Sequence, residues 1–252
     1  MHKYLPLLLT FACAAPAPQP QLQPPTVEAA APTPEPPFSG RVFLEGELPP
    51  AQRWDLDEYM LEVTDEVEYV DEKWSVDTDG GVGGCVVTLH AVEGETPGPP
   101  AREVAYEKIG PRYVPRVLVA PAESTLVLRN VDSPCRGFMA RGIFVQFNLT
   151  LPIGEEKRFE LPNRLAVSPV TCDLREYMQG AIFVVDTVWH AVTAADGSFS
   201  IQDVPEGEYR LRVWHEGVGW FVRDRRVTVS RGEPLRLELP LDPAYKSRRR
   251  RR

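Results

Sequence analysis

The sequence predicts an all-β protein. No stretch of its 252 residues shows the sustained 3.6-residue apolar period that an amphipathic helix would need. Short segments with alternating apolar residues recur instead, and turn residues separate them about every 8–12 positions, as in β-sandwiches and barrels. Asp-Gly and Pro-x-Gly turns punctuate the later segments. With this length and 43% hydrophobic residues, the chain can form one large or two small β domains.

Residues 1–13 are expected to form a secretory signal. His2 and Lys3 supply a basic start, and the apolar run that follows is too short to span a bilayer. Thr10-Phe11-Ala12-Cys13 resembles a bacterial lipobox, in which the cysteine is lipidated and becomes the new N-terminus. We therefore expect a lipoprotein anchored through Cys13 in the periplasm or at the outer membrane. The alternative is ordinary cleavage near Ala15 without a lipid.

Residues 14–37 are predicted to be an extended tether. They consist of Pro, Ala and polar residues with almost no large apolar side chains. Such a segment cannot bury enough apolar surface to fold. Behind a lipidated Cys13 it would hold the folded part of the chain away from the membrane surface.

The first folded domain is predicted over residues 38–186, with N-terminal strands included within 38–94. Residues 55–74 are acidic with scattered aromatics and are expected to be irregular or weakly extended. The other segments have the apolar alternation or short apolar runs of strands. The strands expected in this domain are 39–46, 85–90, 117–120, 126–130, 144–149, 157–161, 165–170 and 181–185.

A second, smaller β-sandwich is predicted over residues 187–241. Its alternating segments are 209–215, 226–229 and 235–239, and turns at Asp196-Gly197 and Pro205-x-Gly207 precede them. Residues 242–252 form a basic tail that ends in five arginines. This tail is interpreted as a solvated end, with contact to anionic lipid or polysaccharide as the alternative.

Charge and motifs exclude several classes of function. The net charge is −8, and an acidic chain is a poor partner for nucleic acid because phosphate contact needs basic surface. The sequence has no Ser/His/Asp pattern, no phosphate-binding glycine loop and no HExxH motif, so we do not expect an enzyme. A binding or structural role is the remaining expectation.

Cys172 and Met178 lie on a short loop between the apolar runs 165–170 and 181–185. A thiol and a thioether on such a loop are the layout of a metal-ligand loop. A blue-copper site uses one Cys, two His and a weak axial Met. Arg175 stands between the two sulfur residues, where a copper loop would hold a histidine.

Two family resemblances cover roughly residues 38–241. The pattern from Asp196-Gly197 through Val204-Pro205 to Trp214-His215 resembles the carboxypeptidase regulatory-like domain, a transthyretin-like β-sandwich. The upstream order resembles bacterial cupredoxin-like proteins, often labelled methylamine-utilisation-like, in which a cupredoxin domain is joined to that sandwich. This order includes Tyr113-Val114-Pro115, Asn130-x-Asp132 and the Cys–Met loop. The resemblance implies a cupredoxin-like β-sandwich followed by a small transthyretin-like one.

Compared with that family, arginine replaces histidine at three positions, namely Arg116, Arg136 and Arg175. Guanidinium has no lone pair for a metal. For the three arginines, one interpretation is an anion-binding cluster and the other is ion pairing with nearby acids such as Asp132, Asp173 and Glu176. For Cys172 and Met178, one interpretation is weak Cu(I) binding and the other is a core thiol and thioether without metal. We expect no cofactor, with copper as the alternative.

The resemblance also implies a disulfide. Cys135 precedes the former ligand position 136 and Cys172 is the former thiolate ligand, so the two loops should meet near the old metal position. We therefore predict a Cys135–Cys172 disulfide and leave Cys85 free. The function predicted from the sequence is a non-catalytic cell-envelope binding or scaffold protein with a copper-free cupredoxin-like domain. Its partner would be an envelope protein or a carbohydrate or anionic ligand. The alternative is a copper-binding or electron-transfer cupredoxin with an altered ligand set.

Overall fold

The computed structural model describes residues 38–135, 137–230 and 235–244, all within one unit that spans residues 35–252. Strands dominate these residues, and the helix among them is α1 (Glu58–Leu61), only four residues long. The predicted all-β fold class is confirmed. No helix in the described ranges is long and apolar enough to cross a bilayer. Cys13, the predicted tether and most of the basic tail lie outside the described residues.

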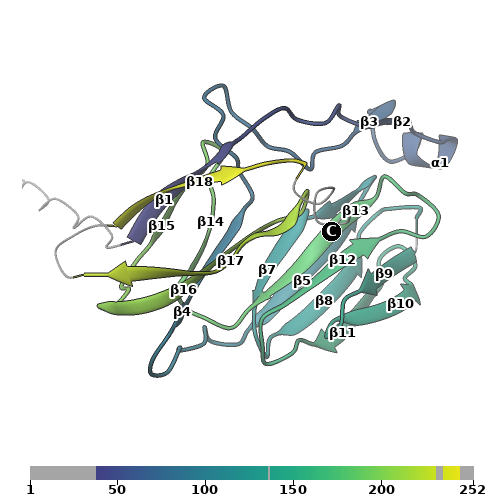
Figure 1. The fold of residues 1–252 in the computed structure, drawn as a ribbon. Coiled ribbons are helices and arrows are strands. Elements are labelled where there is room, and N and C mark those ends of the chain that lie inside the picture. Colours follow the sequence, from purple (N-terminus) through teal and green to yellow (C-terminus); the bar gives the residue numbers. More distant parts are fainter. Residues whose placement is uncertain (1–37, 136, 231–234, 245–252) are drawn as a thin grey trace, which may run out of the picture. The chain divides into compact units, whose positions relative to one another are not determined.

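The first sandwich contains a five-stranded sheet in the order β10-β9-β12-β13-β7 and a four-stranded sheet in the order β11-β8-β5-β6 (Figure 1). Its strands are β5 (Glu103–Ile109), β6 (Arg112–Val114), β7 (Val117–Pro121), β8 (Thr125–Asn130), β9 (Gly137–Arg141), β10 (Gln146–Thr150), β11 (Glu156–Glu160), β12 (Ala166–Thr171) and β13 (Gln179–Val185). Most pairs are antiparallel, but β13 pairs in parallel with β7 and β5 pairs in parallel with β8.

The core of this sandwich draws side chains from both sheets. Leu126 and Leu128 of β8 pack in one cluster with Phe138 of β9 and with Ile182 and Val184 of β13. These residues sit at alternate positions of their strands, so one face of each sheet is apolar, as the sequence pattern predicts. The packing of the two apolar faces forms the core.

The second sandwich contains a three-stranded sheet in the order β15-β1-β18 and a four-stranded sheet in the order β14-β4-β16-β17. Its strands are β1 (Phe38–Leu44), β4 (Val86–Ala91), β14 (His190–Val192), β15 (Ser198–Ile201), β16 (Gly207–His215), β17 (Gly219–Val229) and β18 (Leu235–Leu241). β1 lies between β15 and β18, antiparallel to the first and parallel to the second (Figure 1).

This pairing corrects the predicted domain boundary, because β1 and β4 belong to the second sandwich and not to the first. Phe38 and Val42 of β1, and Val87 and Leu89 of β4, are fully buried in the core that also holds Leu211 of β16. Local alternation identifies each strand but does not say which distant strand it pairs with. The second sandwich is therefore built from both ends of the folded sequence, and the first is inserted between them.

The acidic segment, expected to be irregular or weakly extended, contains two three-residue strands, β2 (Arg53–Asp55) and β3 (Glu68–Val70), with α1 between them. β2 and β3 pair as a small antiparallel sheet. Asp57 caps α1, because its side chain accepts a hydrogen bond from the backbone of Met60 at 3.1 Å. Met60 is fully buried in the first core, which attaches this segment to the first sandwich.

A separate apolar cluster joins the two sandwiches. Ala181, Phe183 and Val185 of β13 pack against Val86 of β4 and Trp214 of β16. The ring centroids of Phe183 and Trp214 lie 5.4 Å apart. The two sandwiches therefore share a buried contact within the described unit.

The turn before β15 depends on a glycine. Gly197 has φ +77°, and a Cβ there would lie 2.2 Å from the carbonyl oxygen of Val42. Gly154 has φ +80° but nothing within 4 Å of the Cβ position. We expect Gly154→Ala to cost about 1 kcal/mol of unfolding free energy from its backbone conformation alone. Gly197→Ala should cost about 2 kcal/mol more, because backbone atoms of β1 must move.

Urea unfolding of the two variants beside the wild type measures the difference. Equal losses for the two glycines would contradict the close approach between the β15 turn and β1.

Candidate functional site

The Cys–Met loop connects β12 to β13. Cys172 follows β12 directly, and Met178 immediately precedes β13. The backbone closes the loop, because the Cys172 N–H donates to the Met178 carbonyl at 3.2 Å and the Met178 N–H donates to the Arg175 carbonyl at 3.0 Å. Both sulfur side chains are buried in the first core.

The predicted disulfide is confirmed: Cys135 and Cys172 are bonded, and Cys85 is a buried free thiol. Cys135 lies just before β9, so the bond joins the β9 end to the Cys–Met loop. A Cβ at Gly137 would lie 3.6 Å from the sulfur of Cys172, so the start of β9 passes directly beside the disulfide. The sulfur of Cys172 is consequently bonded to carbon and sulfur and is not a free thiolate.

Arg116 forms polar contacts with three side chains. Its Nε donates to Glu216 at 2.7 Å, one terminal nitrogen to the Tyr69 hydroxyl at 2.9 Å, and the other to Asp71 at 3.0 Å. Only 16% of its side chain is exposed. The guanidinium therefore ties the first sandwich to the segment after β3 and to the turn between β16 and β17.

Arg175 pairs with Asp57, the cap of α1, through contacts of 2.9 Å from Nε and 2.7 Å from a terminal nitrogen. The hydrogen bond from Arg175 lowers the pKa of Asp57 below its usual value, although partial burial opposes this shift. Arg136, the third arginine at a position where the family resemblance implies a histidine, lies outside the described residues.

The acids paired with these arginines are not the ones named from the sequence. Asp132 accepts a hydrogen bond from the Gly110 N–H at 2.7 Å, and Glu176 accepts one from the Trp54 indole at 3.3 Å. Sequence proximity suggested Asp132, Asp173 and Glu176, whereas the observed partners come from segments remote in the chain. For Arg116 and Arg175, ion pairing is the arrangement that the structure shows.

The residues present do not fit a copper ion. Within the described ranges, no group of three or more His, Cys, Asp or Glu side chains is placed to hold a metal. The described histidines have other contacts: His90 bonds Asp186 at 2.8 Å, His190 contacts the Thr187 carbonyl, and His215 stacks on Trp74. The resemblance to copper proteins therefore does not extend to the ligands.

The segment of residues 53–70 packs against the Tyr177 end of the Cys–Met loop. The ring of Tyr177 lies 5.2 Å from that of Tyr69 and 6.1 Å from that of Trp54. The Arg175–Asp57 pair and the Trp54–Glu176 hydrogen bond add polar contacts to these aromatic ones. The acidic stretch, expected to be irregular or weakly extended, is thus packed against this end of the first sandwich.

Lys108 is a buried residue of this end that sequence reasoning missed. Its ammonium donates to the carbonyls of Cys135, at 3.0 Å, and of Gly137, and it lies 3.6 Å from the Cys135 sulfur. It also lies 4.5 Å from the ring centroid of Phe138. Desolvation, with a smaller contribution from the charge of Arg175, lowers the pKa of Lys108 to about 7, although Asp173 opposes this shift.

A sequence signal for Lys108 did exist. In β5 the buried positions alternate as Val104, Tyr106 and Lys108. A lysine in phase with the apolar face of a strand predicts a buried amine, because burying an uncompensated charge is costly and requires specific partners. The partners themselves, the backbone carbonyls of Cys135 and Gly137 at the start of β9, could not be predicted from that pattern.

One sequence family matches part of the chain. Residues 186–237 match a family described as polysaccharide lyase family 4, domain II, and this range falls within the second sandwich. No match was found among curated protein sequences. The carboxypeptidase regulatory-like assignment stays a prediction.

Three solved structures are similar to part of the chain. A Cu-containing nitrite reductase (NirK) from Thermus scotoductus SA-01 is 20% identical with a TM-score of 0.29, and the match covers 39% of this chain but only 25% of that one. A purple cupredoxin from Nitrosopumilus maritimus is 17% identical with a TM-score of 0.28 and covers 34% of this chain and 100% of its own. A copper binding protein in the apo form is 24% identical with a TM-score of 0.27 and covers 38% and 100%.

Removing the disulfide should lower stability. Cys135 and Cys172 are separated by 37 positions, and closing a loop of that length is worth about 4 kcal/mol in the chain-entropy treatment. We expect Cys135→Ala/Cys172→Ala to lose about that much unfolding free energy and to become insensitive to reductant. Urea unfolding with and without a phosphine reductant is the measurement.

The control is Cys85→Ala, which removes a buried sulfur but no cross-link. This variant should stay as sensitive to reductant as the wild type. Wild-type protein whose stability did not change with reductant would contradict a structural disulfide.

Lys108 should make stability depend on pH. The folded pKa is about 7, whereas the ordinary value is 10.5. Above pH 7 the unfolded chain therefore holds more protons than the folded one, so stability rises with pH. Between pH 7 and about pH 8.5 we expect the wild type to gain about 2 kcal/mol relative to Lys108→Met.

Unfolding curves across this range test the expectation, with Lys157→Met on the exposed face of β11 as the matched control. The range ends at about pH 8.5 because the thiol of Cys85 begins to titrate there in the unfolded chain. If the pH profiles of the wild type and Lys108→Met ran parallel, Lys108 would have no part in the effect.

Proposed function

We propose that this chain is a non-catalytic binding or scaffold protein of the bacterial cell envelope. In this proposal its first sandwich is a cupredoxin-like domain in which a disulfide has replaced copper. The second sandwich, which the resemblance assigns to the carboxypeptidase regulatory-like type, is an accessory β domain. The proposal includes no cofactor and no enzymatic activity.

The observation that carries the proposal is the bond between Cys172 and Cys135. A type 1 copper site needs the cysteine as a thiolate, because the thiolate is the metal ligand. A sulfur in a disulfide cannot fill that role. The cross-link supplies the connection between the two loops that a shared metal would otherwise make.

The surroundings of Cys172 support the same conclusion. Arg116 and Arg175, two of the former histidine positions, are engaged with Asp71, Glu216 and Asp57. Tyr69 and Trp54 pack on the Tyr177 ring beside Met178, whereas Leu174 at the tip of the loop stays exposed. The side chains at this end therefore form ion pairs and packing contacts that hold the fold together.

The disulfide is also consistent with the proposed location. Disulfides form and persist in oxidising compartments such as the bacterial periplasm and cell surface. The lipobox-like sequence at Cys13 would add a membrane anchor, and residues 14–37 would act as the tether. We propose an envelope protein or a carbohydrate or anionic molecule as the partner, and no nucleic acid.

Copper titration tests the proposal directly. We expect wild-type protein to give no intense visible band near about 600 nm on addition of Cu(II), because that band requires a cysteine thiolate bound to Cu(II). Absorbance spectroscopy combined with equilibrium dialysis gives both the band and the stoichiometry. One equivalent of Cu(II) bound with a strong band would instead favour an electron-transfer cupredoxin with an altered ligand set.

The positive control restores ligands to the same scaffold. Cys135→Ala frees the Cys172 thiol, and Arg136→His with Arg175→His puts imidazoles at two positions where the family resemblance implies histidine ligands. We expect this triple variant to develop the visible band that the wild type lacks. The comparison separates loss of the ligands from loss of the fold.

A further inference from the structure

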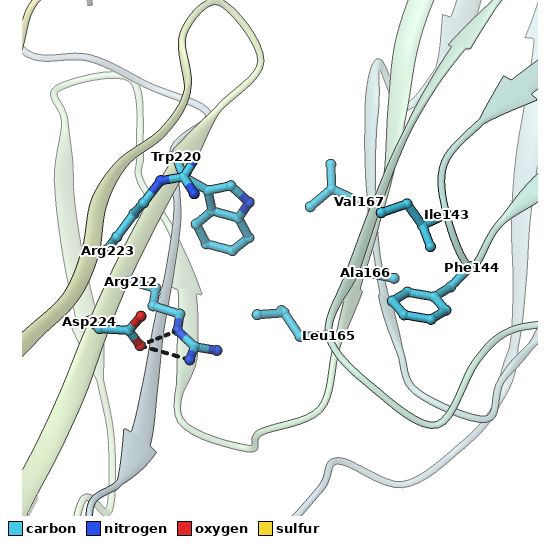
Figure 2. Close-up of a pocket in the computed structure, with 9 residues that line it drawn as sticks. All are labelled: Ile143, Phe144, Leu165, Ala166, Val167, Arg212, Trp220, Arg223 and Asp224. Carbon is cyan, nitrogen blue, oxygen red and sulfur yellow. Dashed lines mark hydrogen bonds and ion pairs between the residues drawn. The ribbon is translucent and has the colours of Figure 1, made fainter. Parts of the chain in front are cut away.

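A groove of about 380 Å³ lies where the first sandwich meets β16 and β17 of the second (Figure 2). It shares no lining residue with the Cys–Met loop, although β12 contributes to both. Its volume is within the usual range of small-molecule sites, about 300–1,000 Å³. The lining residues are Ile143, Phe144, Leu165, Ala166, Val167, Arg212, Trp220, Arg223 and Asp224.

The groove has apolar walls that are partly open to solvent. Ile143 is 89% exposed and Phe144 is 50% exposed, although both are large hydrophobic residues. Figure 2 shows Trp220 projecting from the β17 side toward Val167 and Leu165 on the opposite side. The indole packs on Phe183 with ring centroids 5.5 Å apart, which fixes its position. An apolar body placed between these walls would remove exposed hydrocarbon from water.

The polar end of the groove is built by a β-bulge. Val213 pairs with Val222 and Leu211 pairs with Arg225, so Arg212 alone lies opposite both Arg223 and Asp224. Asp224 has φ +50°, a left-handed conformation that is uncommon outside glycine. Bulges redirect side chains and recur beside functional sites. Here the bulge brings two consecutive charged residues of β17 into the lining of one groove.

The charged side chains in the groove differ in whether they already form an ion pair. Arg212 holds Asp224 through contacts of 2.9 Å and 2.7 Å to one carboxylate oxygen. Arg223 is exposed and forms no ion pair with any residue that the structure describes. Two guanidiniums and one carboxylate thus line the groove, and its lining is net positive in a chain whose net charge is −8. The uncommitted cation is complementary to a single anionic group.

We propose that this groove binds a small amphipathic carboxylate. The apolar body of the ligand lies between Trp220 and the wall formed by Phe144 and Val167, and its carboxylate pairs with the Arg223 guanidinium. The inference rests on the proposed function, because it names the class of ligand for a non-catalytic binding protein. One unpaired guanidinium in the lining, beside an extended apolar wall, fits one carboxylate on a hydrocarbon or aromatic body better than a polyanion.

Calorimetric titration of the full chain with 4-phenylbutyrate and with its uncharged amide, 4-phenylbutyramide, tests the proposal. The two probes share the apolar body and differ in the charge. We expect the wild type to bind the carboxylate about tenfold more tightly than the amide, the size of one charge-assisted hydrogen-bonded contact. Arg223→Gln should remove that tenfold preference and leave amide binding unchanged.

Two further variants separate the contributions. Ile143→Ser, at a mostly exposed position of the groove wall, should weaken both probes. Arg225→Gln, at an exposed arginine of the same strand that does not line the groove, should change neither. Circular dichroism of each variant establishes that it is folded.

Three results would overturn the inference. These are absence of binding by both probes up to their solubility limits, equal affinity for carboxylate and amide, or equal effects of Arg223→Gln and Arg225→Gln. None of them alters the copper titration, which reports on Cys172 at a different part of the first sandwich. If the probe titration is negative and copper addition gives no visible band, the proposed ligand class is wrong and the proposed function still stands.

Discussion

The burial of β13 on both faces is the constraint on which the rest of the structure depends. Successive side chains of a strand point to opposite sides. Ile182 and Val184 therefore enter the core of the first sandwich, while Ala181 and Phe183 enter the cluster shared with Trp214 of the second. The continuous apolar run Ala-Ile-Phe-Val-Val follows from this double role, as in strands covered on both sides. One strand thus closes a core and forms the contact between two sandwiches.

The start of β13 also fixes the Cys–Met loop and Arg116. Met178 directly precedes the strand, and the Ala181 N–H donates to the carbonyl of Arg116. The same stretch of backbone therefore positions the Cys–Met loop and Arg116. The polar and charged groups around them form hydrogen bonds and ion pairs with one another. Lys108 bonds the carbonyl of Cys135 beside the disulfide, and Arg175 bonds the cap of α1. Buried charge is tolerated only with such partners. A covalent bond and internal cations therefore occupy the region where the related ligand pattern would place copper.

The sequence was sufficient for features that depend on local pattern or on chemistry at motif positions. Alternation predicted many of the strands, although β5 and β9 were not among the predicted ranges, and the family order of Cys135 and Cys172 predicted their disulfide. The sequence was insufficient for contacts between segments that lie far apart in the chain. β1 pairs with β18 across nearly the whole folded chain, and Asp57 reaches Arg175, yet neither pairing leaves a local trace. Lys108 is intermediate, since its inward phase on β5 was visible but its carbonyl partners were not.

The bulge in β17 is hard to explain by stability alone. A left-handed Asp224 costs about 1 kcal/mol, and a partly exposed ion pair returns about 1 kcal/mol at most. The Arg212 and Asp224 side chains are 28% and 55% exposed, so their pair offsets the conformational cost without a surplus. What the bulge does accomplish is geometric, because it brings Arg223 and Asp224 together opposite Arg212. Arg116 and Arg175 are engaged in holding the fold, whereas Arg223 is placed beside an apolar wall with its charge uncommitted. A local backbone cost that yields an available cation in a groove is the pattern expected of a site kept for a ligand.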